Sequence, residues 1–279
     1  MIIRCYGARG SIPVSGPEYL GYGGDTTCFE VRSREDDILI IDAGSGIRRL
    51  GNNLLREGRF AYTLFLTHSH WDHILGFPFF KPIYDSRTTI GIRGCTEAQG
   101  DLKKLLARAM SGPYFPVPFD NLAATITYED DCVLSYHVGP IGIWPIHLSH
   151  PNGGQGYKLV EDDKTFVFLT DNELGYRHRG GLTPEAYVEF AWRADLFVHD
   201  AEYTPEEYQR TRSWGHSNYL DALNVAIRAQ VRSFGLYHHN QDRDDNGVDR
   251  MLNHCREIVA AQRLPLEVIA VSQGMEMVL

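Results

Sequence analysis

Thr67-His68-Ser69-His70-Trp71-Asp72-His73 is the most distinctive segment of this chain, and it directly follows the apolar run Thr63 to Leu66. The apolar run predicts a buried strand, and loops that follow strands often carry functional side chains. His68 and His70 point the same way in extended backbone because they are two positions apart. A helix that starts near His70 would place His73 on the same face as His70. The segment therefore predicts a cluster of imidazoles at one edge of a sheet.

The number of metal-binding side chains in this segment exceeds what a structural role needs. The chain has 12 histidines, and three of them fall within this one segment. The alternative is a solvated loop in which Ser69 or Asp72 caps the next helix, but a cap uses only one polar side chain. Imidazole and carboxylate ligands without thiolate suit zinc, iron, manganese or nickel. Because structural zinc sites rely on cysteine, this mixture favours a catalytic site.

The bulk properties of the chain limit its class. With 279 residues, 43% of them apolar, it approaches the upper size for one hydrophobic core, and we expect a single domain over residues 1–279 built as two halves. The formal net charge of −9 repels polyanions over long range, so we expect no long nucleic acid as a partner, unless a local basic patch overrides the charge. No apolar stretch reaches the roughly 20 residues that a membrane helix needs, so we expect no membrane partner.

The cysteines and the N-terminus predict a cytoplasmic protein. The chain has an odd number of cysteines, 5, with no CxxC pair, and we expect them to be buried or free thiols in a reducing cytoplasm rather than a disulfide framework. The first residues, MIIRCYGARG, lack the basic and apolar regions of a signal peptide. The five positions are Cys5, Cys28, Cys95, Cys132 and Cys255.

Hydrophobic patterning divides the chain into two strand-rich halves, each followed by helices. A helix is expected over Ser45 to Arg56 and another from Asp101, and a helix near the C-terminus carries the apolar stripe Val248, Met251, Leu252, Cys255, Ile258 and Val259. This order predicts two sheets packed face to face with helices outside, in the α/β (α+β) class. Strands are expected over Met1–Tyr6, Cys28–Arg32, Ile38–Asp42, Tyr62–Thr67, Ile141–His147, Gly156–Val160, Phe166–Thr170, Leu196–His199 and Phe234–Tyr237.

The pattern HxHxDH after a strand resembles the signature of the metallo-β-lactamase superfamily, and the resemblance spans nearly the whole chain. Later motifs follow in the superfamily's order: His150 in HLSHPNGGQGYKL, Asp171 in FVFLTDNE and His238 in LYHHNQDRDD. The resemblance implies a four-layer αββα sandwich with two divalent metal ions, zinc first, with manganese or iron as alternatives. It implies that one ion takes His68, His70 and His150, that the second takes Asp72, His73 and His238, and that Asp171 bridges them.

Three of these assignments have alternatives in the sequence. His147 and His150 flank the same loop, and the pattern HPxGxxGY favours His150. His238 and His239 are adjacent and face opposite ways in a strand, so we expect only one ligand from the pair and choose His238. Asp171 on its own would be a turn or cap residue, and only the preceding strand and the other motifs make it a ligand.

Within the superfamily, the sequence resembles the branch of cyclic phosphodiesterases and tRNase Z enzymes. His216-Ser217 is similar to a His-Ser-Thr loop in which the histidine helps the leaving group depart, and Asp200 in LFVHDAEYT resembles the acid that orients it. We expect a helix to open at Ser217, and its N-terminus would favour a phosphate. The alternative for His216 is a helix cap without chemistry. The branch also has early glycine-rich turns, but Asp25 stands where Asn is common, which leaves its role undefined.

The spacing between the later motifs bears on the substrate. The tRNase Z enzymes insert a long arm between the third histidine and the bridging aspartate, whereas positions 150 and 171 of this chain are only 21 apart. We therefore expect a small cyclic or linear phosphodiester as substrate, cleaved by a metal-activated hydroxide. Asp72 could take the proton of the nucleophile, and His216 with Asp200 could protonate the leaving group. The alternative functions are an esterase or lactonase that uses the same metals, or a non-catalytic metal-binding sensor. A homo-oligomer is compatible with the sequence.

Overall fold

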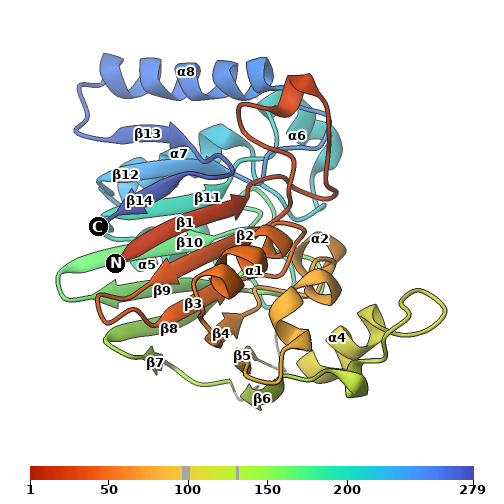
Figure 1. Ribbon diagram of the computed structural model, residues 1–279. Coiled ribbons are helices and arrows are strands. Elements are labelled where there is room, and N and C mark those ends of the chain that lie inside the picture. The colour runs from red at the N-terminus through yellow and green to blue at the C-terminus, as the bar shows by residue number, and fades with distance from the viewer. Residues whose placement is uncertain (96–100, 130–131) are drawn as a thin grey trace.

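The computed structural model contains two β-sheets that lie face to face, with helices on their outer sides (Figure 1). It describes residues 1–95, 101–129 and 132–279. The two chain ends lie close together, because the N-terminal and C-terminal strands are neighbours in the same sheet. This arrangement confirms the predicted αββα sandwich.

The first sheet has 7 strands, in the order β14-β1-β2-β3-β4-β5-β6. Its pairs from β14 to β3 are antiparallel, and its pairs from β3 to β6 are parallel. The parallel strands end at the same edge of the sheet, which is where the first histidine motif follows β4. The strands are β1 (Ile2–Gly7), β2 (Cys28–Arg32), β3 (Ile38–Ile41), β4 (Ala61–Phe65), β5 (Thr89–Arg93), β6 (Thr125–Glu129) and β14 (Glu276–Val278).

The second sheet repeats this plan with 7 strands, in the order β13-β12-β11-β10-β9-β8-β7. Its pairs from β7 to β10 are antiparallel, and its pairs from β10 to β13 are parallel. The carboxyl ends of β10, β11 and β12 therefore meet at one edge. The strands are β7 (Tyr136–Val138), β8 (Ile141–His147), β9 (Gln155–Glu161), β10 (Lys164–Leu169), β11 (Leu196–Asp200), β12 (Ser233–Tyr237) and β13 (Glu267–Ala270).

The helices cover the outer faces of the two sheets and close two of the three apolar clusters. Along α8, Val248, Met251, Leu252, Cys255 and Val259 are buried, as the predicted stripe requires. The helices are α1 (Ile47–Arg56), α2 (Trp71–Ile74) and α4 (Leu102–Ala109) with the first sheet, and α5 (Pro184–Phe190), α6 (Pro205–Thr211), α7 (Tyr219–Arg228) and α8 (Asp245–Ala261) with the second. Short 3-10 turns lie at Pro17–Tyr19, Phe77–Phe79, Lys81–Tyr84 and Phe119–Asn121.

The third apolar cluster fills the space between the sheets and holds them together. Phe29 of β2 lies at its centre, with ring centroids 5.0 Å from Phe168 of β10 and 5.2 Å from Tyr237 of β12. Aromatic pairs at such distances add to the stabilisation that comes from burying their surface. These rings bring the ends of β10 and β12 to the edge where β4 ends.

We expect Phe29→Ala to lower the free energy of unfolding by about 3–5 kcal/mol, because it leaves a cavity between two sheets that cannot collapse onto it. Phe79→Ala is the matched control, since this phenylalanine is 54% exposed and should change stability by less than about 1 kcal/mol. Urea denaturation of both variants measures the difference. Equal effects would mean that the inter-sheet cluster does not carry the stability assigned to it.

The prediction that every cysteine is free is wrong. Cys95 and Cys132 form a disulfide, while Cys5, Cys28 and Cys255 are buried free thiols. Cys95 follows β5 and Cys132 follows β6, so the parallel pairing of these strands brings together two residues that are 37 positions apart. Sequence spacing could not show this contact. The disulfide also removes the argument from free cysteines for a cytoplasmic location, which stays a prediction.

Within residues 1–95, 101–129 and 132–279, no helix combines the length and the apolar character needed to cross a membrane.

Candidate metal centre

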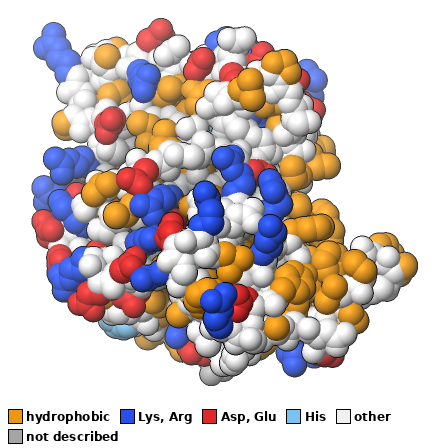
Figure 2. Space-filling view, viewed as in Figure 1, with side chains coloured by type: hydrophobic (Ala, Val, Ile, Leu, Met, Phe, Trp, Pro, Cys, Tyr) orange, Lys and Arg blue, Asp and Glu red, His pale blue; other side chains and the backbone are white. Residues whose placement is uncertain are grey.

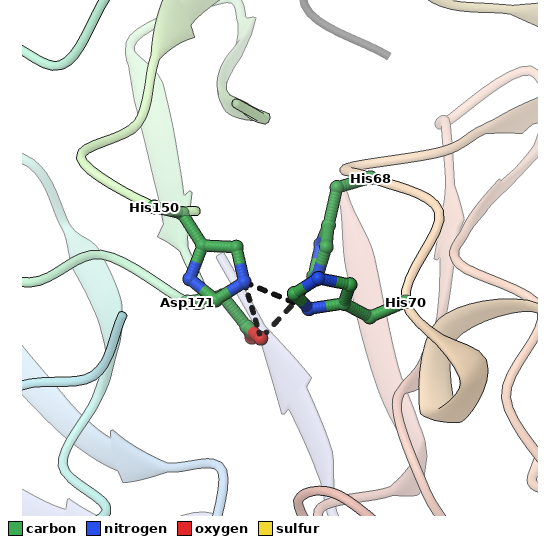
Figure 3. Close-up of side chains that lie close together, drawn as sticks. All are labelled: His68, His70, His150 and Asp171. Atoms are coloured by element: carbon green, nitrogen blue, oxygen red, sulfur yellow. Dashed lines mark hydrogen bonds and ion pairs between the residues drawn. The ribbon is translucent and has the colours of Figure 1, made fainter. Parts of the chain in front are cut away.

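Four side chains from three different loops converge in a first group (Figure 3). His68 and His70 come from the segment after β4, His150 from the loop between β8 and β9, and Asp171 from the end of β10. His150 Nε2 lies 2.9 Å from His70 Nδ1 and 3.7 Å from Asp171 Oδ2. His68 Nε2 lies 3.3 Å from the same carboxylate oxygen. We call these four residues group one.

A second group lies on the other side of Asp171 and consists of Asp72, His73, Asp171 and His238. Asp72 and His73 belong to α2, and His238 directly follows β12. His73 Nε2 is 3.3 Å from Asp72 Oδ2 and 3.3 Å from Asp171 Oδ1. His238 Nε2 is 3.1 Å from Asp72 Oδ2 and 3.3 Å from Asp171 Oδ1. We call these residues group two.

Asp171 divides its two oxygens between the groups, with Oδ2 facing the histidines of group one and Oδ1 facing those of group two. Two atoms that bind the same zinc ion tetrahedrally at 2.0–2.1 Å are about 3.3 Å apart. Three of the four distances between Asp171 oxygens and imidazole nitrogens of the two groups are 3.3 Å, and the fourth is 3.7 Å. This geometry fits two ions that share one carboxylate.

Buried nitrogen atoms without partners provide a further test of this fit. His68 Nε2 and His73 Nε2 are both shielded from solvent, and neither makes a hydrogen bond to any residue in the described part of the chain. Buried polar atoms are nearly always satisfied in folded proteins, so two such nitrogens beside one carboxylate require an explanation. Coordination of a metal ion by each nitrogen supplies it.

The charge states of group one suit a cation. Burial and the His73 ring lower the pKa of His68, and burial with His68 lowers the pKa of His70 to about 4. Burial and His68 hold the pKa of His150 well below its usual range. Burial alone would raise the pKa of Asp171, but the surrounding imidazoles hold it well below the ordinary value. The result is neutral imidazole beside carboxylate, which is the form that binds metal ions.

Backbone strain concentrates at the same residues. Asp171 has a φ of 54° and His238 a φ of 57°, both in the left-handed region that non-glycine residues rarely adopt. Asp42, at the end of β3, has a φ of 64°. Such conformations cost about 1–3 kcal/mol each and persist where the surrounding structure requires them. Here the left-handed turn ends a strand and directs the side chain across the sheet edge.

Two buried carboxylates that the sequence did not single out hold the histidines of group two. Asp42 Oδ2 lies 2.8 Å from His73 Nδ1, and Asp42 also accepts from the backbone N–H and the hydroxyl of Thr67. Glu202 Oε2 lies 2.9 Å from His238 Nδ1. A histidine that binds a metal through one nitrogen commonly donates the other N–H to such a partner, which fixes its tautomer. One feature of the sequence could have identified Asp42: it is an acidic residue at the end of a predicted strand.

Backbone groups support the remaining positions. His150 Nδ1 lies 2.9 Å from the Gly215 carbonyl oxygen. Gly215 has a φ of 103°, and a Cβ there would lie 2.2 Å from His150 Nδ1, so only glycine fits. A Cβ on Gly10 would meet the His238 ring at 2.4 Å, and the neighbouring Ser11 N–H donates to Asp72 Oδ2 over 2.9 Å. The turn that contains Gly10 and Ser11 therefore lies against the metal centre.

The structure separates the histidines between which the sequence left a choice. His147 is exposed at the end of β8, whereas His150 is buried in group one. His239 is buried, but its Nε2 donates to the Val271 carbonyl over 2.8 Å, whereas His238 belongs to group two. Asp25 binds Ser45 Oγ and Gln273 Nε2, each at 2.7 Å, and so holds its own turn.

His216 lies directly beside the two groups. Its ring stacks on His238 with centroids 4.7 Å apart and contacts His150 edge-on at 5.3 Å. Its Nδ1 is 3.4 Å from Glu202 Oε2 and 3.6 Å from Asp200 Oδ2. Burial alone would lower the pKa of His216, but Glu202 and Asp171 raise it to about 9.

The helix after His216 begins at Tyr219, two residues later than expected. Asn218 is its cap, and the Asn218 side chain accepts from the N–H groups of Leu220 and Asp221. The Ser217 hydroxyl donates to the Asn172 carbonyl over 2.6 Å. Because Asn218 takes these N–H groups, they are not free to bind a phosphate, and the expectation that this helix N-terminus favours a phosphate stays a prediction.

The comparisons with known proteins agree with this geometry. A family model described as Beta-lactamase superfamily domain matches residues 38–239, a span that contains both groups. This chain belongs to the β-lactamase superfamily. The superfamily match covers the strands β3 to β12, so it includes strands of both sheets and the edge where the two groups lie.

Individual known proteins are similar to this chain in sequence or in fold. Ribonuclease Z of Haloarcula marismortui is 27% identical over 290 residues, covering 88% of each chain. The metallo-β-lactamase fold protein YhfI from Bacillus subtilis superposes with a TM-score of 0.70 at 18% identity, covering 99% of this chain and 98% of YhfI. Human tRNase Z, short form, gives 0.68 at 18% identity, covering 100% and 99%. The His and Asp groups of this chain offer ligand atoms that could hold divalent metal ions.

The prediction that excluded long nucleic acid is wrong, because the related enzyme from Haloarcula is named a ribonuclease. Net charge is a sum over the whole surface, whereas binding depends on the local potential. Figure 2 shows Lys and Arg side chains gathered on the face over α1, where Arg48, Arg49 and Arg56 are exposed. A chain with an acidic total can therefore still present a basic face.

Proposed function

We propose that this protein hydrolyses phosphodiester bonds with two divalent metal ions held by groups one and two. The observation that carries the proposal is the Asp171 carboxylate, whose two oxygens face two separate sets of imidazoles. Such a pair of ions, when bound, lowers the pKa of a bound water to about 7 and neutralises charge on the phosphate oxygens. Zinc fits the imidazole-rich donor set best, with manganese or iron as alternatives.

The protein's own side chains would do the remaining work. Asp72 Oδ2 accepts from the Ser11 N–H and faces His73 and His238. We propose that Asp72 takes a proton from the attacking water. His216 lies beside both groups, and we propose that it gives a proton to the leaving oxygen. General acid or base help of this kind typically contributes 10²–10⁴-fold to the rate.

We propose small cyclic or linear phosphodiesters as substrates. Between His150 and Asp171 the chain forms a short loop and then the paired strands β9 and β10, which together take up the span. This segment therefore has no residues left for an inserted arm. RNA is a second candidate, which the ribonuclease Z relatives favour.

A substrate panel on metal-reconstituted protein tests the proposal. We expect turnover of bis(p-nitrophenyl) phosphate and of 2′,3′-cyclic nucleotides, with no turnover of an arylester, a lactone or a β-lactam. A precursor RNA in the same panel decides between the two substrate candidates. Turnover of the acyl substrates alone would assign the metal centre to an acyl hydrolase, and no turnover of any substrate would favour a metal sensor.

A further inference from the structure

We propose that Glu202 is a positioning residue that holds two histidines at once: His238 for its metal ion and His216 for the leaving group. The His216 half of this inference rests on the proposed function, whereas the His238 half concerns metal binding alone. The sequence assigns no role to Glu202, although it lies in the segment LFVHDAEYT, two positions after the end of β11.

The Glu202 carboxylate is fixed on both sides. Its Oε1 accepts from Asn240 Nδ2 over 2.8 Å, and its Oε2 lies 2.9 Å from His238 Nδ1. The residue is 1% exposed, so water does not compete for these contacts. A buried carboxylate that is held in this way can orient a neighbouring ring.

The His238 contact sets which nitrogen is free for a metal ion. His238 Nε2 points toward Asp72 and Asp171 of group two, at 3.1 Å and 3.3 Å. If Nε2 binds the ion, the proton of the neutral ring must sit on Nδ1, where the Glu202 oxygen accepts it. Glu202 thus favours the one tautomer that leaves Nε2 available.

The same oxygen faces the second ring. His216 Nδ1 is buried and makes no hydrogen bond within the described residues, and Glu202 Oε2, at 3.4 Å, is nearer to it than Asp200 Oδ2 or Asp171 Oδ2. A small rotation of the ring completes a hydrogen bond with the Nδ1–H donating. That bond points the other ring nitrogen of His216, Nε2, away from the Glu202 carboxylate.

Asp200 is already committed to the backbone. Its Oδ2 accepts from the Asn172 N–H over 2.8 Å, and its Oδ1 accepts from the Ser217 N–H over 2.9 Å. Asp200 therefore ties together the loops after β10 and before α7. Glu202 Oε2 accepts from His238 and is also the carboxylate oxygen nearest to His216 Nδ1, so we assign the orientation of His216 to Glu202.

The rival explanation is a third metal ion, since Glu202, His216 and His238 offer ligand atoms that lie within 4.8 Å of one another. A third ion would need His238 Nδ1 as a ligand, so it would compete with the hydrogen bond to Glu202. Metal stoichiometry separates the two explanations.

The first test measures metal binding of Glu202→Gln by calorimetric titration with zinc, and by the visible spectrum of the cobalt-loaded protein. We expect one ion to bind 10–100-fold more weakly, the other to keep its affinity, and the cobalt spectrum of the weakened position to change. Glu30→Gln is the matched control: Glu30 is also buried, but it lies on β2 of the first sheet and pairs with Arg4 and Arg32. Unchanged affinity for both ions in Glu202→Gln, or three ions per wild-type chain, would overturn the proposal.

The second test measures hydrolysis at saturating metal. Glu202→Gln should lower kcat more for a diester with an alkoxide leaving group than for one that releases p-nitrophenolate. The double variant with His216→Ala should be no slower than His216→Ala alone, because the two residues act through one proton. Additive losses would overturn the link to His216. If the wild type hydrolyses no diester, the proposed function fails, while the zinc titration still decides the role at His238.

Discussion

Asp171→Ala should remove both metal ions and all measurable hydrolysis, because the two oxygens of this carboxylate serve group one and group two separately. His73→Ala should behave differently. Its Nε2 faces only the Asp72 and Asp171 oxygens of group two, so the ion of group one should remain. Elemental analysis after gel filtration should therefore give close to two ions for the wild type, one for His73→Ala and none for Asp171→Ala.

The matched control for this series is His147→Ala, which removes an exposed imidazole from the strand that leads to His150. We expect it to keep both ions. Equal metal loss in Asp171→Ala and His73→Ala would contradict the division into two groups. Wild-type protein that contains no metal and takes up none on addition would contradict the metal centre itself.

His216→Ala should lower the rate strongly only for substrates whose leaving group needs a proton. A ribose alkoxide leaves poorly without protonation, so we expect a loss of about 10²–10⁴-fold for such a diester. Nitrophenolate leaves readily as an anion, so bis(p-nitrophenyl) phosphate should be affected far less. Metal content should not change, because His216 belongs to neither group. Kinetics of both substrates at saturating metal, with metal analysis of the same samples, provide the measurement.

Two outcomes would reassign His216. An equal loss for both substrates would mean that the ring binds phosphate or packs against His238, with which it stacks at 4.7 Å. Loss of one ion would mean that it acts as a ligand, together with Glu202 and His238.

The sequence determined the fold and the order of the metal-binding motifs. The segment from His68 to His73 is local, so its spacing after an apolar run was enough to predict side chains at a sheet edge. The amphipathic stripe of α8 and the two strand-rich halves depend on hydrophobic period, which is also local. These features are readable because each involves neighbours along the chain.

Tertiary structure decided the contacts between segments that are distant along the chain. The division of the Asp171 oxygens, the pairing of Cys95 with Cys132 and the approach of Glu202 to two histidines each depend on parallel strands ending at a common edge. No local residue spacing shows such contacts, because the residues that meet lie far apart along the chain. Asp200 and Glu202 show the limit most directly: Asp200, which the sequence assigned to His216, lies 3.6 Å from its Nδ1, but Glu202, which the sequence did not single out, lies nearer at 3.4 Å.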